Sequence, residues 1–326
     1  MQRKTLVIIA GVVAAVAIAA IAFGPAGLVN LSAPATNRDE PGTGGNPGPQ
    51  PTALGVPTWH EGDSWTYEVN ASSDETIRDG PSATGSITRT VVSADASTYN
   101  VSVQGSFHAR WTLNPIPHGD AAGSIMLDYH MFFEDVTVDG YSWVRTSDLA
   151  IVKEVRTVHF EGTFETDAGA HNASYTATVE TTFDPALNVW AFPIEANETW
   201  NATSTATVHI STDWRVDDPH GAWEFGQDLN MTRDVRLFMM SGAAEDIETP
   251  AGTFPSIPVR IGLPALGRTD TSDLMDVAAG LDHDVPVPRD HFVETWFSGT
   301  AKNVVKVSLF FGGFQVDLAL SAYHLS

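Results

Sequence analysis

Apolar and polar residues alternate along most of the chain after residue 58. Short runs dominated by Val, Thr, Phe, Tyr and Trp, such as residues 86–107, 175–183 and 203–210, are separated by Gly, Asp and Asn. A period of two places successive side chains on opposite faces of a strand, and frequent breaks are typical of antiparallel sheets. The pattern therefore predicts an all-β fold whose sheets have one buried and one hydrated face.

The clearest alternation flanks Gly312-Gly313. A two-residue Gly-Gly turn accommodates positive φ, so we predict a hairpin that pairs Phe311 with Phe314, Leu309 with Val316, and Val307 with Leu318. Four apolar residues on each side of the turn then share one face of the hairpin: Val305, Val307, Leu309 and Phe311, followed by Phe314, Val316, Leu318 and Leu320. Helical patterning is scarce, and its best candidate is residues 272–281, a short helix expected to cover one edge or mouth of the sheet.

The N-terminal segment is patterned differently. Residues 5–23 contain no charge and follow Arg3 and Lys4; as a helix they would extend about 28 Å, enough to cross a bilayer core. We predict an uncleaved signal anchor over residues 1–27 in the cell membrane, with the body outside because the basic residues stay cytoplasmic. A cleaved signal peptide is the alternative, since Ala33-Pro34-Ala35 resembles a cleavage site.

Asparagine usage also indicates export. Seven of the twelve asparagines stand in Asn-x-Ser/Thr sequons, more than Thr-rich strands generate by chance. Each is a candidate glycan acceptor on an exported surface: Asn30, Asn70, Asn100, Asn172, Asn197, Asn201 and Asn230.

The rest of the chain divides into a linker and two related β units. Residues 28–57 are rich in Pro and Gly and are predicted to be an unfolded linker. Residues 58–185 and 186–326 repeat several features: Trp59 to Tyr67 is similar to the segment that starts at Phe192, and Trp143 and Trp296 are each followed ten residues later by a Val-Lys strand. We interpret these units as tandem curved antiparallel sheets of half-barrel type.

Three motifs stand out: an opening W-x-x-G-D-x-W-x-Y, a P-A-G-T-F turn and a closing Trp strand that leads to V-V-K-V. Their residues are Trp59, Gly62, Asp63, Trp65 and Tyr67, then residues 250–254, then Trp296 and Phe297 with residues 304–307. These motifs resemble a group of exported bacterial and archaeal β domains, the DUF3108-like and lipoprotein-carrier-like (LolA/LppX-type) proteins. The resemblance implies a curved antiparallel sheet around an apolar groove.

Composition and motifs restrict the chemistry. The net charge of −23 disfavours a nucleic-acid partner, because phosphates require a basic surface. The absence of Cys excludes disulfides and thiolate sites. No nucleophile, phosphate-loop or dinucleotide signature is present, so we expect no cofactor. A weak candidate metal site consists of His283, Asp284 and His291, which belong to an acidic loop.

Tryptophans provide candidate ligand contacts. Trp65, Trp200 and Trp296 are expected in the core, whereas four that adjoin polar residues or Gly are candidates for lining a groove: Trp111, Trp190, Trp214 and Trp223. The favoured function is a membrane-anchored extracellular protein without catalytic residues that binds a hydrophobic or glycan ligand, or serves as a cell-envelope component. The alternative is an exported hydrolase or metal-dependent enzyme, in which residues such as Asp128, His130 and Asp282 would meet in loops. The sequence does not indicate an oligomeric state.

Overall fold

The computed structural model describes residues 53–73, 82–113, 130–166, 169–217, 222–262, 292–311 and 314–326. The predicted signal anchor, most of the predicted linker, the predicted helix at 272–281 and the sequon at Asn30 lie outside these ranges. Within them, no helix has the length and apolar character needed to cross a bilayer.

The all-β prediction is confirmed. The described part of the chain forms fifteen strands: β1 (Ala53–Leu54), β2 (Ser64–Ser73), β3 (Ser82–Ala94), β4 (Thr98–Leu113), β5 (His130–Arg145), β6 (Ile151–Thr166), β7 (Gly169–Leu187), β8 (Ile194–Glu195), β9 (Thr199–Val216), β10 (Trp223–Ser241), β11 (Glu245–Thr249), β12 (Gly252–Gly262), β13 (Phe292–Ser298), β14 (Asn303–Phe311) and β15 (Phe314–His324).

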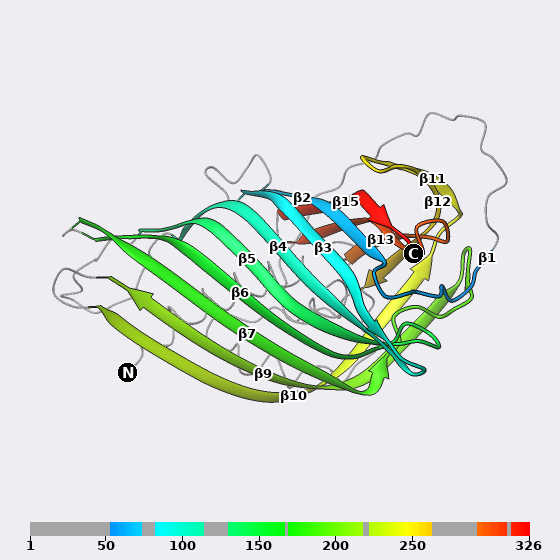
Figure 1. Ribbon diagram of the computed structural model, residues 1–326, viewed down its shortest axis with the longest axis horizontal. Coiled ribbons are helices and arrows are strands. Elements are labelled where there is room, and N and C mark those ends of the chain that lie inside the picture. The colour runs from blue at the N-terminus through cyan, green and yellow to red at the C-terminus, as the bar shows by residue number, and fades with distance from the viewer. Residues whose placement is uncertain are drawn as a thin grey trace, which may run out of the picture.

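Twelve of these strands close into one antiparallel barrel (Figure 1). The order around the barrel is β2-β3-β4-β5-β6-β7-β9-β10-β12-β13-β14-β15, and β15 pairs with β2. The ring closes where residues 238–241 of β10 pair with residues 259–262 of β12. Strand β11 pairs with β12 outside the ring, and β1 and β8 form a separate two-stranded sheet.

The prediction of two tandem half-barrels is therefore wrong. The two predicted units meet edge to edge, because β7 pairs with β9 and β15 returns to β2. An open sheet edge exposes unpaired N–H and C=O groups. Joining the two six-stranded halves pairs these edges, and the result is one barrel with one interior.

The barrel is longer on one side than on the other. Strands β4, β5, β6, β7, β9 and β10 contain 16–19 residues, whereas β12 to β15 contain 7–11. The long strands extend well past the short ones, away from the end where the C-terminus lies (Figure 1). Over residues 223–237, β10 pairs with β9 and with no other described strand. Within the described residues, the ring of strands is therefore complete near the C-terminus, hereafter the closed end, and the long strands alone continue beyond it.

The two faces of the barrel wall differ in polarity. On β9, the buried side chains include Ala202, Ala206 and Trp214, while Asn201 and Asp213 alternate with them and are exposed. The same period of two continues across neighbouring strands, so the apolar phase points inward and the Thr-, Ser- and Asp-rich phase points to water. The apolar inner face belongs to one continuous core cluster.

The C-terminal hairpin has the predicted register. Phe311 pairs with Phe314, and the pairs continue in step along β14 and β15. On the inward side, Val307 and Leu318 lie opposite each other, as do Leu309 and Val316. A slip of one residue would have turned one apolar set outward, which explains why the pattern specified the pairing.

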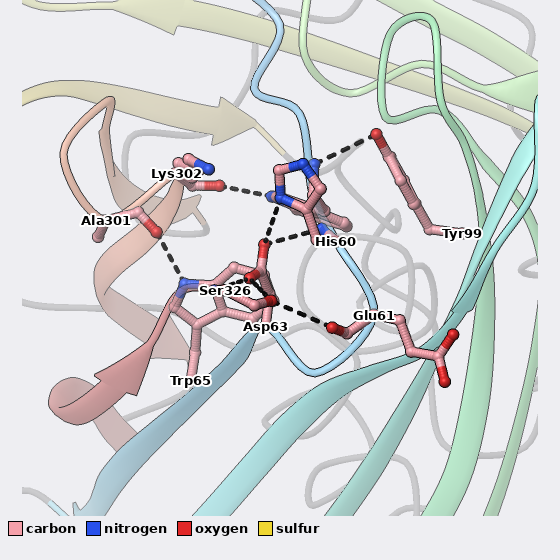
Figure 2. A network of polar contacts seen from close by, with 9 residues as sticks. His60, Glu61, Asp63, Trp65, Tyr99, Ala301, Lys302 and Ser326 are labelled. Carbon is pink, nitrogen blue, oxygen red and sulfur yellow. Dashed lines mark hydrogen bonds and ion pairs between the residues drawn. The ribbon is translucent and has the colours of Figure 1, made fainter.

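Residues of the opening Trp-Gly-Asp-Trp-Tyr motif hold the closed end together. The indole N–H groups of Trp59 and Trp65 donate to the carbonyl oxygens of Lys302 and Ala301 at 2.7 and 2.8 Å. Between the two tryptophans, the buried Asp63 carboxylate accepts the backbone N–H of Ser326 at 2.7 Å (Figure 2). The motif thus links the first barrel strand to the β13–β14 turn and to the last residue of the chain.

The fold also extends into the predicted linker. Ala53 and Leu54 form β1, which pairs with β8, and the Leu54 side chain is buried. Burial of an apolar side chain stabilises the fold. The end of the Pro/Gly-rich segment is therefore ordered where Leu54 contacts the core.

Candidate functional site

A row of inward-facing residues crosses four neighbouring strands. Arg89 of β3 lies opposite Val103 of β4, Val103 opposite Gly140 of β5, and Gly140 opposite Arg156 of β6. Arg89 stands between the buried Ile87 and Val91 in the alternation of β3, which places it on the inner face. The row therefore brings two guanidinium groups into a mostly apolar barrel wall.

Arg156 is held firmly in this wall. Its side chain is 1% exposed. The Nη1 atom donates to the carbonyl oxygen of Tyr141 at 2.5 Å, and Nη2 donates to the Ser142 hydroxyl at 2.5 Å and to a Glu154 carboxylate oxygen at 3.3 Å. Gly140 makes room for the guanidinium, because a Cβ atom there would lie 2.9 Å from Cδ of Arg156 and 2.0 Å from the Val155 carbonyl oxygen.

Glu154 completes the cluster from the same strand. It lies two residues before Arg156 on the inward phase, is buried, and accepts the Ser142 hydroxyl at 3.1 Å. Burial raises the pKa of Glu154 against the opposing effects of Arg156 and Arg89. Burial likewise lowers the pKa of Arg156 to about 10, so that this guanidinium keeps its charge at neutral pH.

Arg89 differs from Arg156 in its surroundings. Its side chain is partly exposed although its neighbours in the same phase are buried. It interacts electrostatically with Glu154, Arg156 and the buried Tyr67 hydroxyl, yet it forms no ion pair with any carboxylate in the described ranges. The cluster of Arg89, Glu154 and Arg156, hereafter the inner Arg cluster, carries two cations and one acid.

Other inward residues surround the inner Arg cluster. Val179 of β7 lies opposite Arg156 and is partly exposed, and the same row continues through Ile210 of β9 to Leu229 of β10. Leu229 is 41% exposed. A third cation, Arg233, also falls on the inward phase of β10, opposite the buried Ala206. Apolar surface and positive charge therefore adjoin on the inner face.

The four tryptophans predicted to line a groove occupy different places. Trp214 is buried on the inner face with its ring 5.3 Å from that of Tyr175, and the Trp190 ring lies 5.3 Å from Phe297 in the core. Trp111 lies in β4, and Trp223 begins β10 opposite Val216. Trp65 and Trp296 are buried as expected, and Trp200 is partly buried.

The candidate enzymatic residues are not brought together by the described part of the chain. His130 begins β5, whereas Asp128, Asp282, His283, Asp284 and His291 lie outside the described ranges. No group of three or more His, Asp or Glu side chains in those ranges is arranged to hold a metal ion. Of the exposed His–acid pairs, His108 and Asp135 lie 3.7 Å apart on the hydrated face without a third partner.

A polar hollow of about 420 Å³ lies on the outside of the long wall. It is lined by Glu161, Gly162, Asn172, Ala173, Ser174, Arg215 and Asp217. The Arg215 guanidinium is already paired with Asp217 and Glu224 at 3.0 and 3.2 Å. Because its cation is compensated and its lining is mixed in charge, this hollow offers weaker recognition than the inner Arg cluster.

Sequence reasoning missed the inner Arg cluster. A signal for it existed, because Arg89 and Arg156 each occupy the apolar phase of a strand, between Ile87 and Val91 and before Val158 respectively. A charge on the apolar phase of an alternating strand is unusual, since burial of an ion is costly. The charges that meet across strands are determined by which strands pair and in what register. The alternation within each strand does not specify this pairing.

Comparisons of the chain with protein-family models, with curated proteins and with solved structures found no match.

Proposed function

We propose that the protein binds an apolar ligand inside the barrel and has no catalytic role. The observation that carries this proposal is the inner face itself: it is mostly apolar over both halves of a twelve-stranded ring, while the outer face is mostly hydrophilic. Eight strands enclose about as much space as their own side chains fill. Twelve strands enclose more, and partly exposed inward residues such as Val179, Thr181 and Val208 are suited to contact a ligand.

The location of the body outside the membrane, tethered by residues 1–27, is part of the same proposal. It is supported by the position of the sequon asparagines: Asn70, Asn172, Asn197, Asn201 and Asn230 are all exposed. Asn100 is partly buried, and its side-chain oxygen has no hydrogen-bond partner. We expect glycopeptide mass spectrometry of the native protein to find glycans at the exposed sites and not at Asn100; bare asparagines throughout would contradict the exported location.

We further propose that the two six-stranded halves arose from one repeated unit. Trp143 and Lys153 lie opposite each other in β5 and β6, with the ammonium 5.6 Å from the ring. Trp296 and Lys306 repeat this pair in β13 and β14 at 4.9 Å, and in both hairpins a register shift follows the Trp directly. The likeness to lipoprotein-carrier-like half-barrels stays a hypothesis, and the closed ring of strands differs from an open half-barrel.

Photo-crosslinking tests the proposed ligand. Full-length protein in a lipid-free amphipathic polymer is mixed with hexadecanol that carries a photoreactive diazirine near the end of its chain. We expect saturable labelling of inward residues on β6, β7 and β9, competed by unlabelled hexadecanol, because the inner face is apolar. Labelling confined to outward residues, or labelling that does not saturate, would refute an interior binding site.

A further inference from the structure

We propose that the ligand carries a monoanionic carboxylate head group, which the inner Arg cluster binds while the apolar chain lies along the inner face. This inference rests on the proposed binding function and adds the class of ligand, a single-chain fatty acid. Arg89 makes the direct contact, and Arg156 and Glu154 shape the site beside it.

The charge balance of the inner Arg cluster favours a ligand with one negative charge. Glu154 and Arg156 form an ion pair of 3.3 Å within the buried wall, which compensates one cation. Arg89 adds a second positive charge that interacts electrostatically with both members of the pair. A partly desolvated cation is costly unless a counter-ion accompanies it, and one monoanion neutralises the excess. The protein as a whole has a net charge of −23, so the positive interior contrasts with its surface.

The geometry of the two arginines also favours a carboxylate. The Arg156 guanidinium is directed toward β5 by the Tyr141 carbonyl and the Ser142 hydroxyl, and its side chain packs over Gly140. Arg89 lies two strands away in the same row and keeps part of its surface accessible. A guanidinium presents a planar set of donors that matches a carboxylate.

The other half of the barrel has apolar residues at the positions that correspond to the inner Arg cluster. Matching the Trp143–Lys153 pair to Trp296–Lys306 aligns Gly140 with Val293, Glu154 with Val307 and Arg156 with Leu309. Matching Trp65 to Trp200 aligns their cross-strand partners, Arg89 and Met239. Each charged position is thus apolar in the second half, where the same barrel wall is built from Val, Leu and Met. The architecture does not require these charges, so a ligand is a better reason for them.

The experiment compares two ligands that differ in the head group alone. Dissociation constants of radiolabelled hexadecanoate and hexadecanol are measured by equilibrium dialysis with the full-length protein after bound lipid has been removed. Arg89→Met reproduces the residue of the second half and leaves the Glu154–Arg156 pair intact. Arg236→Met removes an exposed, outward-facing arginine of β10 and is the matched control.

We expect the Arg89→Met variant to bind hexadecanoate roughly 10- to 100-fold more weakly, as loss of a charge-assisted contact predicts. Its affinity for hexadecanol should stay within about 2-fold of the unmodified protein, and Arg236→Met should alter neither affinity. If hexadecanoate and hexadecanol bind equally and Arg89→Met has no effect, the head-group inference is wrong and the proposed binding function stands. If neither ligand saturates the protein, both are wrong.

A further variant of the inner Arg cluster distinguishes loss of the head-group contact from a folding defect. The double variant E154V/R156L introduces the residues of the second half at both charged positions of this pair, keeps Gly140, and removes the ion pair without leaving either partner alone. With an unchanged circular dichroism spectrum, it should still bind hexadecanol and should lose part of the preference for hexadecanoate. The same substitutions are then combined with Arg89→Met. If the combined variant still prefers hexadecanoate over hexadecanol as strongly as the unmodified protein does, the assignment is wrong.

Discussion

Replacement of the buried carboxylate of Asp63 tests how the closed end of the barrel is held together. In Asp63→Asn the shape is preserved, but one carboxylate oxygen becomes an NH₂ group. Asp63 accepts the N–H of His60 at 2.9 Å through one oxygen, and the N–H and hydroxyl of Ser326 at 2.7 and 2.9 Å through the other. The amide therefore places a donor against a donor at one of these two sites.

The magnitude follows from these contacts. The Asp63 side chain is 0% exposed, so water does not replace a lost partner. A hydrogen bond to a charged group contributes about 1.5–3 kcal/mol, and a buried donor left without an acceptor costs a similar amount. We expect Asp63→Asn to lower the free energy of unfolding by about 3–5 kcal/mol, a large share of the stability of a typical domain.

The assay is equilibrium unfolding in urea at pH 7, followed by tryptophan fluorescence. The control is Asp95→Asn in the β3–β4 turn, where Asp95 accepts the N–H groups of Ser97 and Thr98 at 2.7 and 2.8 Å but is exposed. Its effect should be much smaller, because water substitutes for the lost contacts. Equal effects of the two substitutions, or a loss below about 1 kcal/mol for Asp63→Asn, would refute the reasoning.

The Asp63 carboxylate also makes the free energy of unfolding depend on pH. Burial raises the pKa of Asp63, but the hydrogen bonds from Ser326 and His60 and the charge of Lys302 outweigh this effect, so the pKa lies below its usual value. Because the folded-state pKa is depressed, the stabilisation is fully present above the unfolded-state pKa of about 3.9 and is lost as the pH falls through the folded-state value. Asp63→Asn should flatten this acid limb of the stability profile, and an unchanged limb would contradict the assignment.

Two further predictions concern barrel closure and the ion pair in its wall. The double variant M240C/R260C should form a disulfide on mild oxidation, because the two residues lie opposite each other where β10 pairs with β12 and the chain has no other Cys. The control D228C/R260C should stay reduced, and failure of M240C/R260C to cross-link would contradict closure of the ring. Arg156→Leu should lower the free energy of unfolding by about 3–5 kcal/mol because Glu154 is left buried without its cation, whereas E154V/R156L should lower it much less. Unfolding in denaturant measures both losses, and equal losses would show that the ion pair itself stabilises the fold.

Local features of the fold were predictable from the sequence. The register of β14 and β15 followed from two apolar phases around Gly312-Gly313, since a two-residue turn leaves one pairing that buries both sets. The closure between β10 and β12 was not predictable, because strand patterning does not identify partners that lie far apart in the chain. Half-barrels and a closed barrel have the same alternation within each strand and differ in which edges meet.

The candidate site was harder to predict for the same reason. Trp59 and Trp65 were recognised as parts of a motif, but their partners, Lys302 and Ala301, lie 243 and 236 residues away. Arg89 and Arg156 become a cluster when β3 to β6 are aligned in register through Val103 and Gly140. The tryptophans predicted to line a groove have polar neighbours in sequence. Side chains at alternate positions of a strand point to opposite faces, so Trp214 is buried beside an exposed Asp213.

Native mass spectrometry of the full-length protein purified from its native cells tests the central claim most directly. Gentle purification should preserve a ligand held inside the barrel, and activation should then expel it. We expect a discrete added mass that corresponds to a long-chain carboxylate, bound at one per chain and lost in Arg89→Met. Protein that carries no apolar molecule, in preparations that retain a folded barrel, would contradict it.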